Sequence, residues 1–95
     1  MTLVAEGAAS GASGEISART EQLARDHGLS RRQAEVLTQL ALGKTNNAIA
    51  AVLGCADGTV EFHVSHLLRK MHCENRTEIV ARYWSKRLGR PAREP

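Results

Sequence analysis

The sequence predicts a small all-α protein, and three observations lead to that prediction. Apolar residues recur three or four positions apart in successive stretches, which is the spacing of one helix face. Glycines or short polar groups separate these stretches, as they do between short helices. No stretch alternates apolar and polar residues as a half-buried strand would. We therefore expect a four-helix bundle with a helix-turn-helix plan and an extra short N-terminal helix.

The length and composition limit what such a fold can do. With 95 residues, 42% of them hydrophobic, the chain supports one core of about 65 residues, which is too small for a deep substrate cavity. It contains no apolar run long enough to span a membrane and no signal-peptide pattern, so we expect a cytoplasmic protein without membrane attachment. Its two cysteines, Cys55 and Cys73, form no CxxC pair and are expected to remain reduced.

Charge is divided unevenly along the chain. Residues 1–28 carry a net charge of −2, whereas residues 29–95 carry +5. A basic second part favours a polyanionic partner, although many proteins of this charge bind no nucleic acid.

The N-terminal part divides into two segments. Residues 1–14 are rich in Gly, Ala and Ser without a periodic apolar pattern, which predicts a flexible leader. Residues 15–28 carry a narrow stripe at helical spacing, which predicts a short helix that ends at Gly28. The stripe consists of Ile16, Thr20, Leu23 and His27. We expect this helix to dock on the bundle or on a partner.

The next two helices each begin at a capping residue. Ser30 is the predicted N-cap of a helix that ends before Gly43, and Thr45 is the N-cap of a shorter helix that ends at Gly54. The expected buried residues of the first are Ala34, Val36, Leu37, Leu40 and Ala41, and those of the second are Ile49, Ala50, Val52 and Leu53.

The longest periodic run follows a turn at residues 55–58. It places Val60, Val64, Leu67, Leu68 and Met71 within one narrow sector of a helix, opposite Phe62, Ser65, His66 and Arg69. A final helix is expected after Asn75, with Thr77, Ile79, Val80, Tyr83 and Trp84 along it. We expect the helical domain to span residues 29–88 and a tail to span residues 89–95.

The stretch LSRRQAEVLTQLALGKTNNAIAAVLGCADGTVEFHVSHLLRKMHCENRTEIVA, Leu29 to Ala81, resembles the GerE-like DNA-binding domain of LuxR- and NarL-type bacterial transcription regulators. The shared features are Leu29, Ser30, Glu35, Val36, Leu37, Gly43, Thr45, Ile49, Ala50, Leu53, Thr59, Val60, His63, Leu68, Lys70, Met71, Asn75, Arg76 and Thr77. The resemblance implies a tetrahelical helix-turn-helix that binds double-stranded DNA, with its third helix, at about residues 59–72, in the major groove.

The resemblance also implies that Glu61, Phe62 and Ser65 face base edges. Lys is common at the position of Glu61 in such proteins, a capping Ser at Ala56, and Glu at Ala48. A carboxylate can accept from cytosine N4 and an aromatic ring can touch a thymine methyl, so both residues can contribute to base recognition. The alternative for Glu61 is an acid stabilised by the helix dipole. The missing cap costs about 0.5–2 kcal/mol unless Asp57 replaces it.

Phosphate contacts are expected from residues that flank the groove: Lys44, Thr45, Asn46, Asn47, Thr59, His63 and Arg69. Thr45 can cap a helix at the same time, and the charged members can instead be solvated surface groups. Lys70 is expected to pair with Glu35.

Neither a metal nor another cofactor is expected. His63, His66, His72 and Cys73 lie near one helix end, but their spacing matches no closed zinc set. Enzymatic activity is the least favoured hypothesis, because the sequence has no phosphate loop, no paired carboxylates in a plausible cleft and no nucleophile motif.

The resemblance implies a homodimer on DNA, formed through the last helix. The candidate pairing residues are Ile79, Val80, Tyr83 and Trp84, with core packing as the alternative. Pairing would imply an inverted-repeat site with half-sites about one helical turn apart. RNA polymerase is a further candidate partner.

Two other functions fit parts of the sequence. A sigma-factor promoter-recognition domain shares the Leu-Gly and Gly-Thr-Val features, but the HVSHLLRKM and NRTEIVA stretches argue against it. An interaction module that kept the fold and lost DNA binding would explain Glu61 and Ala48. Such regulators usually carry a sensor domain, so we expect either a stand-alone effector or a fragment of a longer chain.

Overall fold

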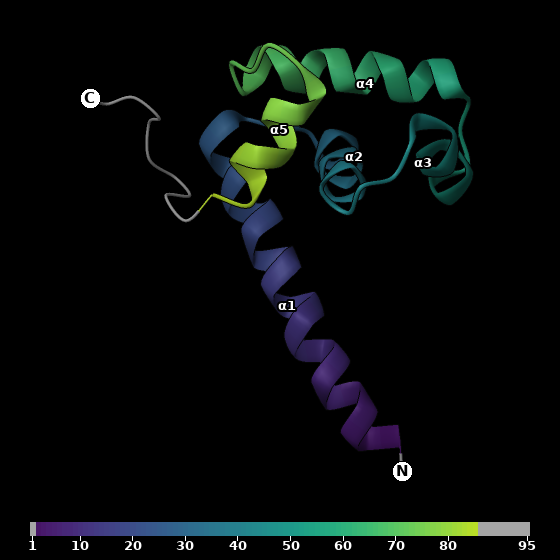
Figure 1. The fold of residues 1–95 in the computed structure, drawn as a ribbon, viewed down its shortest axis with the longest axis vertical. Coiled ribbons are helices and arrows are strands. Elements are labelled where there is room, and N and C mark those ends of the chain that lie inside the picture. Colours follow the sequence, from purple (N-terminus) through teal and green to yellow (C-terminus); the bar gives the residue numbers. More distant parts are fainter. Residues whose placement is uncertain (1, 86–95) are drawn as a thin grey trace.

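The computed structural model describes residues 2–85, with side chains from Gly14 onward, and every regular element in this range is a helix (Figure 1). The elements are α1 (Thr2–His27), α2 (Arg31–Ala41), α3 (Asn46–Leu53), α4 (Asp57–Lys70) and α5 (Arg76–Tyr83). The predicted all-α class is confirmed. The predicted tail at 89–95 and the last three residues of the predicted domain lie outside the described residues.

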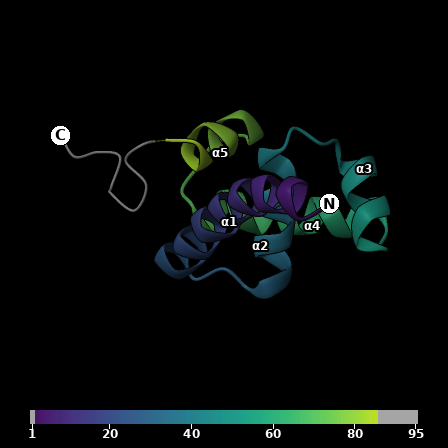
Figure 2. The same ribbon diagram turned by 90° about the horizontal axis from the view of Figure 1, so that it is seen from below.

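Helix α2 lies at the centre of the bundle and contacts each of the other four helices. Both views of the ribbon place it between α3 and α5 (Figures 1 and 2). Its apolar face and the expected stripe of α4 supply most of the core, which contains Leu23, Val36, Leu37, Leu40, Ala41, Ile49, Ala50, Val60, Leu67, Met71, Cys73, Ile79 and Tyr83. None of the described helices has the length and apolar character needed to cross a membrane.

Helix α1 is longer than the sequence predicted. It runs without a break from Thr2, so the expected boundary between a leader and a helix at residues 14 and 15 is absent from the structure, and its first half extends away from the bundle (Figure 1). Thr20 and Leu23 are buried as expected. Once packing fixes the segment around them, adding residues to an existing helix costs far less than nucleating one.

The expected caps hold α2 and α3. Ser30 accepts from the Gln33 N–H while the Gln33 side chain accepts from the Ser30 N–H, which is a complete capping box. Thr45 accepts from the Ala48 N–H at 3.1 Å. Gly54 ends α3 in the left-handed region, with φ of 70°, which a glycine adopts without steric cost.

Helix α4 starts without a side-chain cap. Its N-cap is Ala56, and Asp57, which we expected as a possible substitute, lies one position inside the helix. The Asp57 carboxylate instead accepts from Nδ2 of Asn47 at 3.3 Å. It therefore links α4 to the start of α3 and adds negative charge where the helix dipole is positive.

Two packing predictions were wrong. Val52 was expected in the core, but its side chain is 55% exposed because α3 is only two turns long and buries Ile49 and Ala50. Lys70 does not pair with Glu35. Its ammonium donates to the Gly28 carbonyl and to Oε1 of Gln33, both at 2.9 Å, while Glu35 pairs with Arg32 at 2.8 Å.

Candidate nucleic-acid interface

The outward side of α4 is a polar and aromatic surface on a firmly packed helix. Val60 and Leu67 are fully buried, which fixes the rotation of the helix about its axis. Phe62, Ser65 and Arg69 therefore face away from the bundle, and all three are exposed, Phe62 to 59%. Because α4 has 14 residues, it is about 21 Å long, which suits the major groove of B-DNA.

Three side chains on this surface form a connected row. The Phe62 ring packs edge-to-face on the His66 ring, with centroids 4.4 Å apart. Nη2 of Arg69 donates to Nδ1 of His66 at 2.9 Å. Burial, followed by the positive charges of Arg69 and Lys70, lowers the pKa of His66. The neutral imidazole therefore accepts from Arg69 at Nδ1 and carries its own proton at Nε2.

The other predicted base and groove-flanking residues on α4 are also exposed. Glu61 forms neither a hydrogen bond nor an ion pair with any described residue, so its carboxylate oxygens are available as acceptors. The Ser65 hydroxyl donates to the Phe62 carbonyl at 2.8 Å, which leaves its lone pairs free to accept. Thr59 lies exposed in the first turn of the helix.

His63 is less available than the sequence suggested. Its side chain is half-buried, and Nδ1 is enclosed without a hydrogen-bond partner among the described residues. Only the other ring nitrogen could reach a phosphate. In the part of the chain that the structure describes, no three His, Cys, Asp or Glu side chains lie close enough to hold a metal ion.

The start of α3 lies beside this face, because Asn47 contacts Asp57 in the first turn of α4. Thr45 and Asn47 are exposed, whereas Lys44 and Asn46 are half-buried. Short helices leave their first backbone N–H groups pointing outward, where an anion can bind. The structure thus brings the predicted phosphate-contacting residues of the α2–α3 turn to the edge of the predicted base-contacting helix.

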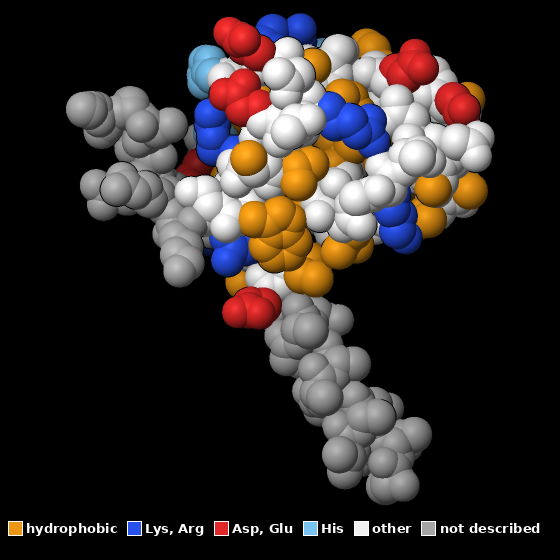
Figure 3. Space-filling view, viewed as in Figure 1, with side chains coloured by type: hydrophobic (Ala, Val, Ile, Leu, Met, Phe, Trp, Pro, Cys, Tyr) orange, Lys and Arg blue, Asp and Glu red, His pale blue; other side chains and the backbone are white. Residues whose placement is uncertain are grey.

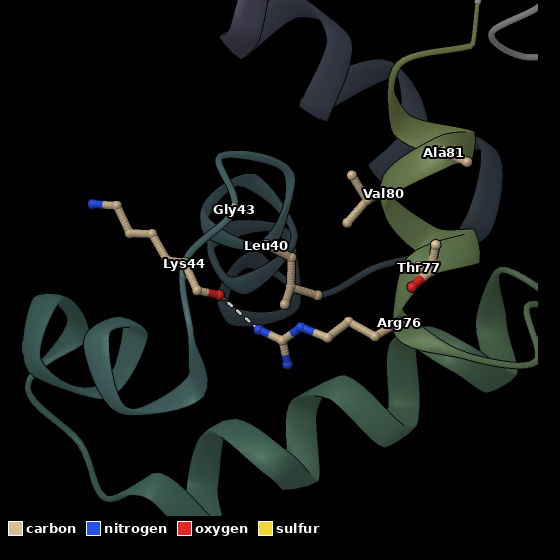
Figure 4. Close-up of a pocket in the computed structure, with 7 residues that line it drawn as sticks. All are labelled: Leu40, Gly43, Lys44, Arg76, Thr77, Val80 and Ala81. Atoms are coloured by element: carbon tan, nitrogen blue, oxygen red, sulfur yellow. Dashed lines mark hydrogen bonds between the residues drawn. The ribbon is translucent and has the colours of Figure 1, made fainter.

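Arg76 is a residue whose role at this site the sequence did not reveal. It is the first residue of α5, yet its guanidinium reaches the α2–α3 turn. Nη2 donates to the Lys44 carbonyl and Nη1 to Oδ1 of Asn46, both at 2.6 Å. Figure 4 shows the Lys44 side chain leaving in the opposite direction. Asn75, Arg76 and Thr77 belong to the family resemblance. The sequence did not show what Arg76 contacts, and only the structure does.

The predicted pairing surface on α5 must be corrected for two residues. Ile79 and Tyr83 are 0% exposed and belong to the core, and the Tyr83 hydroxyl lies against that of Thr20 on α1. Val80 is half-buried and Trp84 is 45% exposed, and Leu42 at the end of α2 is exposed nearby.

Figure 3 shows apolar side chains gathered over α5 and beside it, with basic side chains on either side. A hollow of about 380 Å³ there is lined by Leu40, Gly43, Lys44, Arg76, Thr77, Val80 and Ala81 (Figure 4).

The chain is similar to known bacterial proteins. Residues 27–83 match the family described as bacterial regulatory proteins, luxR family. A probable transcriptional regulatory protein NarL of Mycobacterium tuberculosis is 38% identical over 86 residues, which cover 90% of this chain and 39% of that protein. The uncharacterized transcriptional regulatory protein YhcZ of Bacillus subtilis is 48% identical over 50 residues, 53% of this chain and 23% of the relative.

A third relative is the two-component response regulator PprB of Pseudomonas aeruginosa, 45% identical over 51 residues, 54% of this chain and 18% of the relative. This chain therefore spans well under half the length of each of these three proteins. No solved structure gives a significant match.

Proposed function

Because the chain belongs to the luxR family of bacterial regulatory proteins, we propose that it binds double-stranded DNA as the DNA-binding part of a transcriptional regulator. The observation that carries this proposal is the outward face of α4. A helix whose inner face packs in the core presents Phe62, Ser65 and Arg69 to solvent, and the N-terminus of α3 flanks it. This is the arrangement in which a helix-turn-helix places its second helix in the major groove.

Base recognition in this proposal is assigned to Glu61, Phe62 and Ser65. The free carboxylate of Glu61 can accept from a cytosine N4 amino group, and the Phe62 ring can touch a thymine methyl. The Ser65 oxygen can accept a hydrogen bond while its hydroxyl proton stays donated to the Phe62 carbonyl. An acid on this face makes no contribution to phosphate attraction, so the positive charge must come from the flanks.

The flanking charge and donors are supplied by two groups of residues. Arg69 lies toward the far end of α4, and Lys44, Thr45, Asn46 and Asn47 lie at the start of α3. Thr59, and one nitrogen of His63, complete the set on α4. Contacts of this kind position the protein on DNA without reading its sequence.

We also propose that two copies pair through the outer face of α5. Val80 and Trp84, with Leu42 beside them, supply the exposed apolar surface there. This part of the proposal rests on the exposure of these side chains and on the family membership. A dimer would require an inverted-repeat site.

Fluorescence anisotropy of a labelled random-sequence duplex, titrated with the protein at several salt concentrations, tests the proposal. We expect the apparent affinity to fall steeply with salt, and Arg69→Ala to reduce the slope of log affinity against log salt by about 1. Arg25→Ala is the matched control, because Arg25 is an exposed arginine on α1. A folded protein that fails to bind at about 25 mM salt would contradict DNA binding and favour a protein partner at Phe62.

A further inference from the structure

One arginine connects the pairing helix to the phosphate-contacting turn. Arg76 starts α5, and its planar fork donates once to the backbone of Lys44 and once to the side chain of Asn46. Both hydrogen bonds are 2.6 Å long and partly buried, and Figure 4 shows the one to the Lys44 carbonyl. Hydrogen bonds that are charge-assisted and shielded from water are stronger than neutral ones at the surface.

Among the described residues, the side-chain hydrogen bonds that join this turn to α5 are those of Arg76. Helix α3 packs on α4 and α2. It makes no extensive contact with α5 in the described part of the chain. Within the turn, Gly43 adopts a φ of 84° and the Lys44 N–H donates back to the Gln39 carbonyl. These local bonds shape the turn, but Arg76 fixes where it lies relative to the helix on its other side.

The contact also orients the Asn46 amide. Arginine carries only donors, so the carbonyl oxygen of Asn46 must be the atom that faces it. The amide nitrogen, with its two donors, then points away from Arg76. Phosphate oxygens accept hydrogen bonds and never donate them near neutral pH, so this orientation presents Asn46 correctly for a DNA backbone.

We propose that Arg76 is a positioning residue for DNA binding, which holds Lys44, Thr45 and Asn46 in the orientation that the phosphate backbone requires. This inference rests on the proposed function. Arg76 does not need to touch DNA itself, because its guanidinium is already directed at the turn.

A lysine cannot replace the arginine in this role. Its single ammonium keeps the charge but lacks the rigid fork that spans two acceptors at once. Arg76→Lys therefore separates the geometric role from the charge. Arg82→Lys is the matched control, since Arg82 lies on the same helix, is partly buried and donates to the Met71 carbonyl at 2.7 Å, away from the turn.

The test is anisotropy with a fluorescein-labelled random-sequence duplex, for the native chain, Arg76→Lys, Arg82→Lys, Asn46→Ala and the double variant Arg76→Lys/Asn46→Ala. Circular dichroism melting verifies that each variant is folded. We expect Arg76→Lys to weaken binding about tenfold and Arg82→Lys less than about twofold. In the Asn46→Ala background the Arg76→Lys loss should shrink to less than about threefold, because the two residues act through one contact.

The outcomes are distinct. If the native chain binds and Arg76→Lys binds equally well, the positioning role is overturned while DNA binding stands. If the Arg76→Lys and Asn46→Ala losses multiply, the two residues act independently and the proposal is also overturned. If the native chain itself does not bind, the proposed function fails and the role of Arg76 falls with it.

Discussion

At the scale of single residues, the outward face of α4 combines an acid, an aromatic ring and an imidazole where a purely electrostatic surface would carry basic residues. The structure shows why this is tolerated. Glu61 is solvated, and Phe62 packs on His66 rather than standing alone. His66 in turn anchors the Arg69 guanidinium. In the proposed function, the charge that attracts DNA and the groups that contact bases are therefore carried by different residues.

Phe62 is expected to matter for recognition and little for folding. Because its ring is 59% exposed, Phe62→Ala should change the free energy of unfolding by less than about 0.5 kcal/mol. The same variant should weaken binding to a selected duplex more than to random DNA, since a base contact is lost and phosphate contacts remain. Urea denaturation and anisotropy measure the two effects. A large loss of stability would mean that the ring belongs to the core.

His27 gives the fold a pH dependence with a definite sign. Burial, opposed in part by the negative charge of Asp26, lowers the pKa of His27 below its ordinary value of 6.5. Between the lowered pKa and 6.5 the unfolded chain binds more protons than the folded one. Stability should therefore fall as the pH drops through about 6.5 and level off below the folded-state pKa.

The check is a series of urea unfolding curves between about pH 5 and pH 7.5. The native chain should gain stability as the pH rises, and His27→Gln should show a smaller gain. His66→Gln serves as the comparison, because the pKa of His66 is lowered in the same direction and its half-buried side chain lies on the outward face of α4. An identical pH dependence in the native and His27→Gln chains would refute the assignment.

At the scale of the helices, α2 to α5 differ in how their first turns are capped. Ser30, Thr45 and Asn75 cap their helices with side-chain oxygens, whereas Ala56 leaves α4 uncapped. The backbone of Ala56 is extended, with φ of −81° and ψ of 156°, which is the conformation that a capping serine adopts. Among α2 to α5, the helix proposed to contact DNA bases is thus the one without a side-chain N-cap.

Ala56→Ser should stabilise the fold. A serine hydroxyl at this position can accept from an unpaired N–H in the first turn, which is worth about 1 kcal/mol. The urea midpoint should rise while the slope of the transition stays the same. Ala51→Ser is the control, because Ala51 is exposed inside α3 and has no cap to form. Equal effects of the two substitutions would show that the cap is not gained.

Sequence alone predicted most of the elements and only part of the site. Helical periodicity and capping residues identified α2 to α5, because local spacing decides which face is apolar. The prediction failed for Val52, because α3 is too short to bury that side chain although the apolar pattern includes it. The prediction for Lys70 was wrong and the contact of Arg76 was missed. Their partners, Gln33 and Asn46, lie 37 and 30 residues away in the sequence, and side-chain pairs at such separations leave no periodic signal.

At the scale of the whole molecule, α1 is tied to the end of α5 by a buried hydroxyl cluster. The Thr20 hydroxyl lies 2.7 Å from both the Thr38 and the Tyr83 hydroxyls, and Tyr83 donates to the Ile16 carbonyl at 2.9 Å. Arg19 adds bonds to the Tyr83 and Ser85 carbonyls and lies over the Trp84 ring. A movement of α1 would therefore reach the edge of the proposed pairing surface.

Thr20→Val should loosen this connection while keeping the shape of the side chain. Removing the shared hydroxyl takes one hydrogen bond from Tyr83 and one from Thr38, each of which keeps a backbone partner. The expected cost is about 0.5–1.5 kcal/mol of unfolding free energy per bond lost. Hydrogen exchange should accelerate at residues 16–27 more than in α4. Gln22→Ala is the control, because Gln22 lies in the same helix stretch and bonds to Asp26 and Arg25 rather than to the hydroxyl cluster. Uniform acceleration in every helix would mean that Thr20 contributes only global stability.

The central claim is that the outward face of α4 reads DNA sequence. Selection of duplexes from a random library tests it most directly, carried out in parallel with the native chain, Glu61→Gln and Phe62→Ala. We predict that the native chain enriches a defined motif. Glu61→Gln should lose preference at a cytosine position and Phe62→Ala at a thymine position, with the rest of the motif retained. Enrichment of the same motif by all three proteins would contradict base reading by this face, and no enrichment by the native chain would contradict sequence-specific binding altogether.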